Sequence, residues 1–170
     1  MAKSKAKILV VDDNSGIRAA LKVLLPLHFS QVELIPSPKE LVTKLADFRP
    51  DVVLLDMNFH TDINTGNEGL YWLSEIKKRT PETEVVLFTA YADIQLAVEG
   101  MKRGAFDFIV KPWDNDKLVE TLKAAYDRTG KKERTAVLVQ AHQSSDSRNY
   151  EHHYAYRFAQ RHIADLRWCR

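Results

Sequence analysis

The segment Ile8-Leu-Val-Val-Asp12-Asp13 joins four consecutive apolar residues to two adjacent carboxylates. The apolar run predicts a buried β-strand, and the two acids follow where the strand ends. Neighbouring carboxylates repel each other unless a positive charge lies between them, so this strand end indicates a site for a divalent cation.

The same pattern recurs along the chain. Residues 52–55 form an apolar run that leads into Asp56, and this run is continuous rather than alternating, which is typical of a parallel strand covered on both faces. Two later apolar runs, 85–88 and 106–110, lead into Thr89 and Lys111. In a parallel sheet all these strand ends share one edge. We therefore expect five polar groups to meet there: Asp12, Asp13, Asp56, Thr89 and Lys111.

Between the apolar runs lie segments with helical periodicity and helix-end signals. Asn14 or Ser15 can cap a helix that ends around Pro26, Ser37-Pro-Lys-Glu40 reads as a capping box, and Asp93 can cap a fourth helix. With a further short strand at 32–35, helices are expected over 15–27, 37–48, 70–76, 93–104 and 115–129, the last two closed by Gly104 and Gly130. Five strands alternating with five helices predict a parallel sheet with helices on both faces.

The composition is that of an ordinary globular domain with an appendage: 170 residues, 45% apolar and 28% charged. Residues 131–170 hold eight Lys/Arg and four Asp/Glu, a formal charge of +4, which leaves −2 for the first 130 residues. We predict a domain over 1–130 and a linker and C-terminal tail over 131–170, with 136–140 able to extend the last helix. The single Cys169 and the lack of a signal peptide or membrane span lead us to expect a cytoplasmic protein.

Three carboxylates at one sheet edge make an oxygen-rich pocket suited to Mg²⁺ or Mn²⁺. Beside the ion, one ionised carboxylate can attack phosphorus and form an aspartyl phosphate, while the Lys111 ammonium and the Thr89 hydroxyl stabilise the transferring oxygens. Taken singly, each residue has a plainer explanation as a helix cap, a turn residue, a solvated charge or a strand former. Their coincidence at four strand ends favours the functional interpretation.

Together, Asp12-Asp13, Asp56, Thr89-Ala90 and Lys111-Pro112 resemble the receiver domain of bacterial two-component response regulators, over roughly residues 6–128. The resemblance implies a flavodoxin-like, doubly wound (βα)5 fold with strand order 2-1-3-4-5 and a cis Lys111-Pro112 peptide. It also implies that Asp56 is the phosphoacceptor.

The remaining roles follow from the same resemblance. Asp12 or Asp13, with Asp56 and the backbone carbonyl of Asn58, would hold Mg²⁺. Thr89 and Lys111 would contact the phosphoryl group, and Phe108 would be the aromatic side chain that turns inward on activation.

The implied function is a phosphorylation-activated switch of a two-component phosphorelay, fed by a sensor histidine kinase or a phosphotransfer protein. Its only chemistry would be its own phosphorylation and dephosphorylation. The face near 92–101 and 113–122 would serve as the output or homodimer surface. Residues 89–113 resemble receivers that precede an ATPase domain in enhancer-binding transcription activators. Because no phosphate-binding Gly-x-x-x-x-Gly-Lys-Ser/Thr loop occurs, the chain is either a single-domain regulator or a fragment.

Other interpretations fit less well. A haloacid-dehalogenase-like phosphatase also forms an aspartyl phosphate, but it needs a general acid where this chain has Asn58. The intact cluster argues against a receiver that only docks partners. In the tail, His142, His152, His153, His162 and Cys169 match no common zinc template, and without a helix-turn-helix we expect no direct nucleic-acid binding. The bulky Tyr91 leads us to expect a long-lived phosphorylated form.

Overall fold

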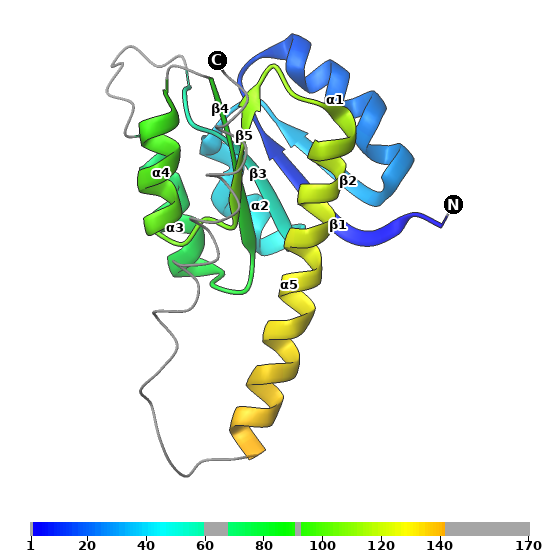
Figure 1. The fold of residues 1–170 in the computed structure, drawn as a ribbon, viewed down its shortest axis with the longest axis vertical. Helices are drawn as coiled ribbons and strands as arrows, with labels where there is room; N and C mark the ends of the chain where they lie inside the picture. Colours follow the sequence, from blue (N-terminus) through cyan, green and yellow to red (C-terminus); the bar gives the residue numbers. More distant parts are fainter. Residues whose placement is uncertain (1, 60–67, 91–92, 142–170) are drawn as a thin grey trace, which may run out of the picture. The chain divides into compact units, whose positions relative to one another are not determined.

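The fold is a five-stranded parallel sheet. The computed structural model describes residues 2–59, 68–90 and 93–141, with side chains as far as residue 130 (Figure 1). The strands are β1 (Ser4–Val11), β2 (Phe29–Ile35), β3 (Val52–Asp56), β4 (Glu84–Ala90) and β5 (Asp107–Lys111). They pair in the order β2-β1-β3-β4-β5, and every pair is parallel. The predicted fold class and strand order are confirmed.

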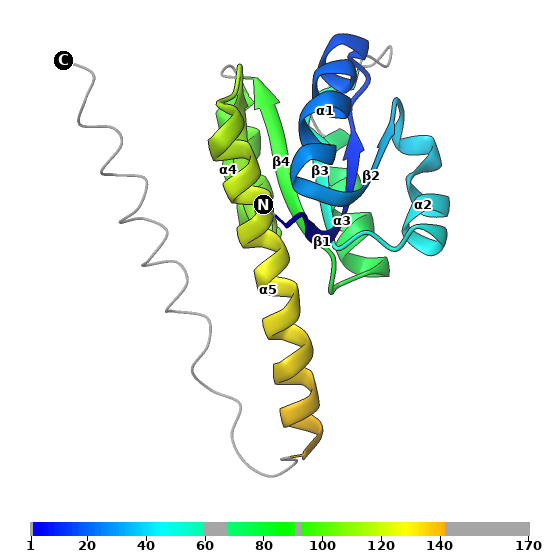
Figure 2. The ribbon, with the colours of Figure 1, turned by 90° about the vertical axis from the view of Figure 1, so that its right-hand side faces the viewer.

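Helices cover both faces of this sheet (Figure 2). They are α1 (Ser15–His28), the 3₁₀ turn η1 (Pro38–Glu40) leading into α2 (Leu41–Asp47), α3 (Glu68–Arg79), α4 (Ile94–Lys102) and α5 (Asn115–Ala141). Leu21 of α1 and Leu122 of α5 belong to one core cluster, whereas Leu73 of α3 and Ala97 of α4 belong to the other. The sheet therefore separates two apolar cores.

Strand β3 shows why its apolar run is continuous. Val52 and Leu54 point into the core with α1 and α5, while Val53 and Leu55 point into the core on the opposite face. All four side chains are fully buried. Each such side chain contributes about 1.5–3 kcal/mol relative to exposure. A strand buried on both faces needs apolar residues along its length, so the polar residue Asp56 comes only at its end.

Several predicted element boundaries needed correction. Helix α1 contains Pro26 and continues to His28, because buried Leu21 and Leu25 hold its last turns against the sheet. Strand β2 starts at Phe29 rather than at residue 32, and the Phe29 side chain is buried. Ser37 caps as expected, although its hydroxyl accepts the N–H of Lys39 and the segment begins as a 3₁₀ turn.

The C-terminal helix was predicted to end at Gly130 and does not. Helix α5 continues through Gly130 to Ala141, which confirms that 136–140 extend it. Gly104 closes α4 as expected, with a φ of 95° that glycine tolerates and other residues rarely adopt. The predicted features of 142–170, including the histidines and Cys169, lie outside the described residues, as does Tyr91. The division into 1–130 and 131–170 stays a prediction. Within the described part of the chain, no helix has the length and apolar character needed to cross a membrane.

Candidate functional site

Strand register brings the first acids together at the C-terminal edge of the sheet. Val11 pairs with Leu55, so the residues that follow them in the chain, Asp12 and Asp56, lie side by side. Asp56 in turn pairs with Phe88 of β4, which puts Thr89 one residue beyond it. The predicted meeting of strand ends is therefore observed in the sheet itself.

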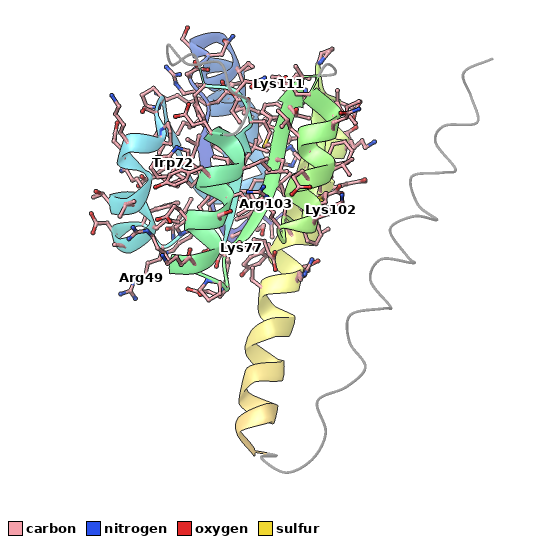
Figure 3. All side chains as sticks on the ribbon, turned by 90° about the vertical axis from the view of Figure 1, so that its left-hand side faces the viewer. Arg49, Trp72, Lys77, Lys102, Arg103 and Lys111 are labelled. Carbon is pink, nitrogen blue, oxygen red and sulfur yellow. The ribbon has the colours of Figure 1, made fainter. Side chains whose placement is uncertain are left out.

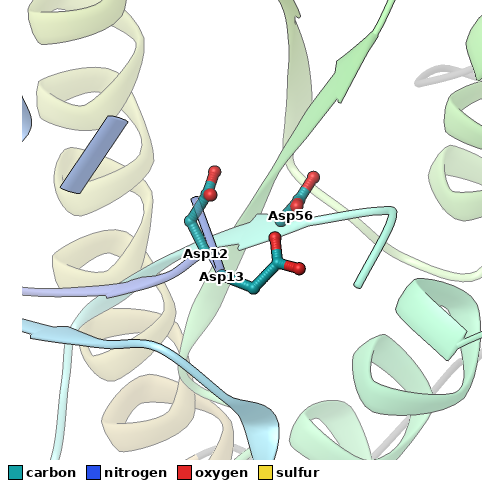
Figure 4. Close-up of side chains that lie close together, drawn as sticks. All are labelled: Asp12, Asp13 and Asp56. Carbon is teal, nitrogen blue, oxygen red and sulfur yellow. The ribbon is translucent and has the colours of Figure 1, made fainter. Parts of the chain in front are cut away.

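The three acids form a compact cluster (Figure 4). Asp12, Asp13 and Asp56 each offer one carboxylate oxygen, and these oxygens lie within 4.8 Å of one another. Asp12 is fully buried and Asp56 nearly so, while Asp13 is half-buried. Three carboxylates this close repel one another strongly unless positive charge lies beside them.

Lys111 is a cation that the protein itself places between two of these acids. Its Nζ lies 2.8 Å from Asp12 Oδ2 and 3.0 Å from Asp56 Oδ1, so one ammonium bridges two acids. The side chain comes from β5, on the far side of β4, and its Nζ lies 4.7 Å from the centre of the Phe88 ring. Figure 3 shows Lys111 at this end of the molecule. The long lysine side chain, packed over an aromatic ring, lets a residue of β5 reach acids at the ends of β3 and β1, two and three strands away.

The rest of the local structure orients Asp12. The backbone N–H of Asn14 donates to Asp12 Oδ1 over 2.8 Å, and Arg18 Nη1 donates to the Asp12 carbonyl over 2.8 Å. Asn14 also caps α1, because its side-chain oxygen accepts the N–H of Ile17. The turn after β1 therefore both orients the Asp12 carboxylate and begins α1. The sequence pointed to Asn14 as a cap, but nothing in it indicated the role of Arg18.

The electrostatics of Asp56 reflect this crowding. The pKa of its carboxyl is raised from 3.8 to about 6, mainly because burial disfavours the charged form. The Lys111 charge lowers this pKa, the Asp12 charge raises it again, and hydrogen bonds from Lys111 and from the Asn58 N–H lower it further. Asp56 is therefore ionised at neutral pH but less readily than a solvated aspartate.

The donor set fits Mg²⁺. The ion prefers hard oxygen ligands and commonly uses only one or two carboxylates together with waters. Asp12, Asp13 and Asp56 supply such oxygens, and Lys111 neutralises only one of their three charges. A divalent cation would relieve the repulsion from Asp12, which adds to the larger effect of burial in raising the pKa of Asp56.

Two further predicted residues, Thr89 and Phe108, have roles that stay predictions. The Thr89 side chain is fully buried, and its hydroxyl donates to the Ala90 carbonyl over 3.3 Å. Phe108 is half-buried and packs against the core on the α3 and α4 face. The Lys111-Pro112 peptide is cis, as expected. The metal-binding role of the Asn58 carbonyl also stays a prediction.

One contact was missed in the sequence. The side-chain amide of Asn58 donates to the carboxylate of Asp93, which was expected to cap α4. In the structure Asp93 makes no side-chain capping bond. Because 35 residues separate the pair along the chain, no local signal could have revealed it.

Comparison with known proteins agrees with this geometry. Residues 8–123 match the model of the response regulator receiver domain. Regulatory protein AtoC of Escherichia coli is 34% identical over 112 residues, which cover 66% of this chain and 23% of AtoC. The DNA-binding transcriptional regulator NtrC of Salmonella typhimurium is 35% identical over 118 residues, which cover 69% of this chain and 24% of NtrC. The chain thus spans about a quarter of the length of these relatives.

A solved structure gives the same result. The N-terminal signal receiver domain of a two-component system response regulator from Bacteroides fragilis is 56% identical, with a TM-score of 0.66, over 72% of this chain and 98% of that one. The alternative of a haloacid-dehalogenase-like phosphatase finds no support in these matches. The fold, the acidic edge and the matches together show that the chain belongs to the receiver domain family of two-component response regulators, the phosphorylation-activated switches of those systems.

Proposed function

We propose that Asp56 is the residue of this receiver that accepts the phosphoryl group, in a reaction that requires Mg²⁺. The observation that carries the proposal is the bridge from Lys111 Nζ to both Asp12 and Asp56 beside a third carboxylate. This arrangement holds an acid, a fixed cation and a set of metal-ligand oxygens within reach of one another. A purely structural ion pair would not need the further acids.

Asp56 is suited to act as the nucleophile. Its Oδ1 accepts hydrogen bonds from Lys111 Nζ and from the Asn58 N–H, which orient the carboxylate. In the reaction, a carboxylate lone pair would form the new oxygen–phosphorus bond. The bond from phosphorus to the donor's leaving group would break, and its electron pair would depart with that group. With a pKa of about 6, the attacking group is ionised at neutral pH without any separate base.

Mg²⁺ would be held by Asp12, Asp13, Asp56 and the Asn58 backbone carbonyl, and it would neutralise charge on the transferring group. Lys111 needs little movement to do the same, because its ammonium already lies on the acceptor carboxylate. The Thr89 hydroxyl now donates to the Ala90 carbonyl and would turn to a phosphoryl oxygen instead. Each contact places positive charge or a donor where negative charge gathers.

Phosphorylation would then change the surface formed by α4, β5 and α5. Thr89 lies on β4, next to β5, so its movement toward the phosphoryl group would change the packing against β5, where the Phe108 side chain is half-buried. The α4-β5-α5 face is the proposed output or homodimer surface. To shift the population usefully, the phosphoryl group need favour the active form by only a few kcal/mol, up to about 5.5 kcal/mol for a near-complete change.

The proposed partners follow from family membership. A sensor histidine kinase or a phosphotransfer protein would donate the phosphoryl group in the cytoplasm, and the chain would control transcription as part of a longer regulator. Similarity to AtoC and NtrC supports the last step, although the match covers about a quarter of each. No direct contact of this chain with nucleic acid is proposed.

The test is chemical labelling of the purified protein with a small phosphodonor and Mg²⁺, read by intact mass. Wild type should gain one phosphoryl group, and Asp56→Asn should gain none. Asp47→Asn removes an exposed acid of α2 and serves as the matched control, which should label like wild type. Labelling of Asp56→Asn, or labelling of wild type that is unaffected by a chelator, would refute the proposal.

A further inference from the structure

The carboxylate of Asp93 is bound to a residue of the site rather than to its own helix. Asp93 immediately precedes α4, where aspartate usually caps through its side chain. Here the Asp93 side chain makes no capping bond and instead accepts a hydrogen bond from the side-chain amide of Asn58. Both residues are half-buried, so the bond is shielded from competing water.

Asn58 connects this carboxylate to the phosphoacceptor. While its side chain donates to Asp93, its backbone N–H donates to Asp56 Oδ1 over 3.3 Å. A single residue therefore lies between the two acids, held by its side chain at one end and by its backbone at the other. Loss of the side-chain bond frees the orientation of the peptide that contacts Asp56.

The chemistry of the pair favours a purpose beyond helix capping. Asp93 brings a negative charge to the side chain of Asn58, whose backbone N–H contacts Asp56. Asparagine would cap a helix as well without that charge. However, an ionised carboxylate accepts hydrogen bonds and never donates them, so it holds the NH₂ end of the Asn58 amide in one orientation.

We propose that Asp93 is a positioning residue for phosphoryl transfer to Asp56, acting through Asn58. This inference rests on the proposed function, because it assumes that Asp56 is the acceptor. Asp93 itself touches neither the phosphoryl group nor the metal ion. It holds the segment after β3 so that the Asn58 peptide faces Asp56 and the metal-ligand oxygens.

The test compares Asp93→Ala, Asp93→Asn and the control Asp51→Ala. Asp51 is a half-buried acid at the opposite edge of the sheet, and its Oδ2 accepts the N–H of Lys7 over 2.8 Å. Two quantities are measured: the maximal labelling rate at saturating phosphodonor, and the Mg²⁺ dissociation constant from tryptophan fluorescence or calorimetry without phosphodonor. Trp113 is a suitable reporter, since its ring contacts Phe88 beneath the Lys111 ammonium.

Asp93→Ala should lower the maximal rate and weaken Mg²⁺ binding by about tenfold or more, the usual cost of losing a residue that orients a ligand. Asp93→Asn keeps an acceptor oxygen but loses the charge and adds a donor, so it should show a smaller loss in the same direction in both quantities. Asp51→Ala should lose stability without changing either quantity for the folded protein. Because Asp93→Asn preserves size and capping ability, it should fold even where the alanine variant does not, and a fully wild-type rate and metal affinity in Asp93→Asn would then count against the inference.

A double-mutant cycle separates action through Asn58 from a direct effect. If Asp93 works through Asn58, then Asn58→Ala and the double alanine variant should each resemble Asp93→Ala, with no additive loss. Additive losses, a wild-type rate and metal affinity in Asp93→Ala, or faster labelling in that variant would each overturn the inference. Failure of wild type to label at Asp56 would refute the proposed function, whereas normal wild-type labelling with unaffected Asp93 variants would refute this inference alone.

Discussion

Replacing Asp56 with asparagine is expected to stabilise the metal-free protein at neutral pH and to leave its stability near pH 4 almost unchanged. The reason is the raised pKa of the buried carboxyl, about 6 in the folded protein against an ordinary value of 3.8. Below both pKa values, the Asp56 side chain is a neutral carboxylic acid with the same shape as the asparagine amide. Above both values the folded protein holds a poorly solvated charge that asparagine lacks.

The sign and size of this stability difference follow from proton linkage. Between pH 3.8 and about pH 6 the folded protein still binds the proton that the unfolded chain has released, so the free energy of unfolding falls as pH rises. A shift of about two pKa units at 1.36 kcal/mol per unit gives a loss of about 3 kcal/mol, complete above the folded pKa. Asp56 is only 4% exposed, so solvent screening reduces this value little.

Urea unfolding in the presence of a chelator, repeated from about pH 4 to about pH 7.5, measures the difference between wild type and Asp56→Asn. The advantage of the variant should grow by about 2–3 kcal/mol over that range, because the unfolded carboxyl is already partly ionised at about pH 4. Asp47→Asn, which removes an exposed acid, should show no such growth. Added Mg²⁺ should stabilise wild type by about 2.7 kcal/mol at a hundred times its dissociation constant and the variant much less. A difference that does not vary with pH would refute the reasoning.

Three further predictions concern stability, each measured by chemical or thermal unfolding. Lys111→Met should destabilise the metal-free protein by about 2 kcal/mol or more at neutral pH, because it leaves two buried acids unpaired, and Mg²⁺ should recover more stability than in wild type; equal loss with and without the ion would contradict this. Gly69→Ala should lower the free energy of unfolding by about 1–3 kcal/mol, since the added Cβ would lie 2.7 Å from the Met57 Cα. Gly130→Ala lies inside α5 with open space around it and should raise the free energy of unfolding by about 0.5–1 kcal/mol. A Gly69→Ala variant more stable than Gly130→Ala would contradict this. Glu84→Gln should cost about 1–2 kcal/mol, because this fully buried carboxylate contacts partly exposed cations of α3 and α5. An unchanged unfolding midpoint would show that the ion cluster contributes nothing.

Much of the fold could be predicted because buried parallel strands leave a local signature. The runs ending at Asp12 and Asp56 are apolar at every position, and the alternation with helical segments indicates a parallel sheet. Where a boundary depended on more than local preference, the prediction was wrong. Pro26 and Gly130 are helix-breaking residues by local preference, yet α1 and α5 run past them. Local preference is worth about 1–3 kcal/mol per residue, which packing and helix propagation can exceed.

The identity of the acidic cluster was readable from the chain alone, because each of its residues follows an apolar run and parallel strands share an edge. The contacts that organise it were not readable. That Lys111 bridges Asp12 and Asp56 over the Phe88 ring depends on register across four strands. That Asp93 binds Asn58 rather than its own helix depends on where two loops meet. A local pattern reports what each residue prefers near its neighbours in sequence, whereas hydrogen bonds between distant residues exist only after the strands have paired.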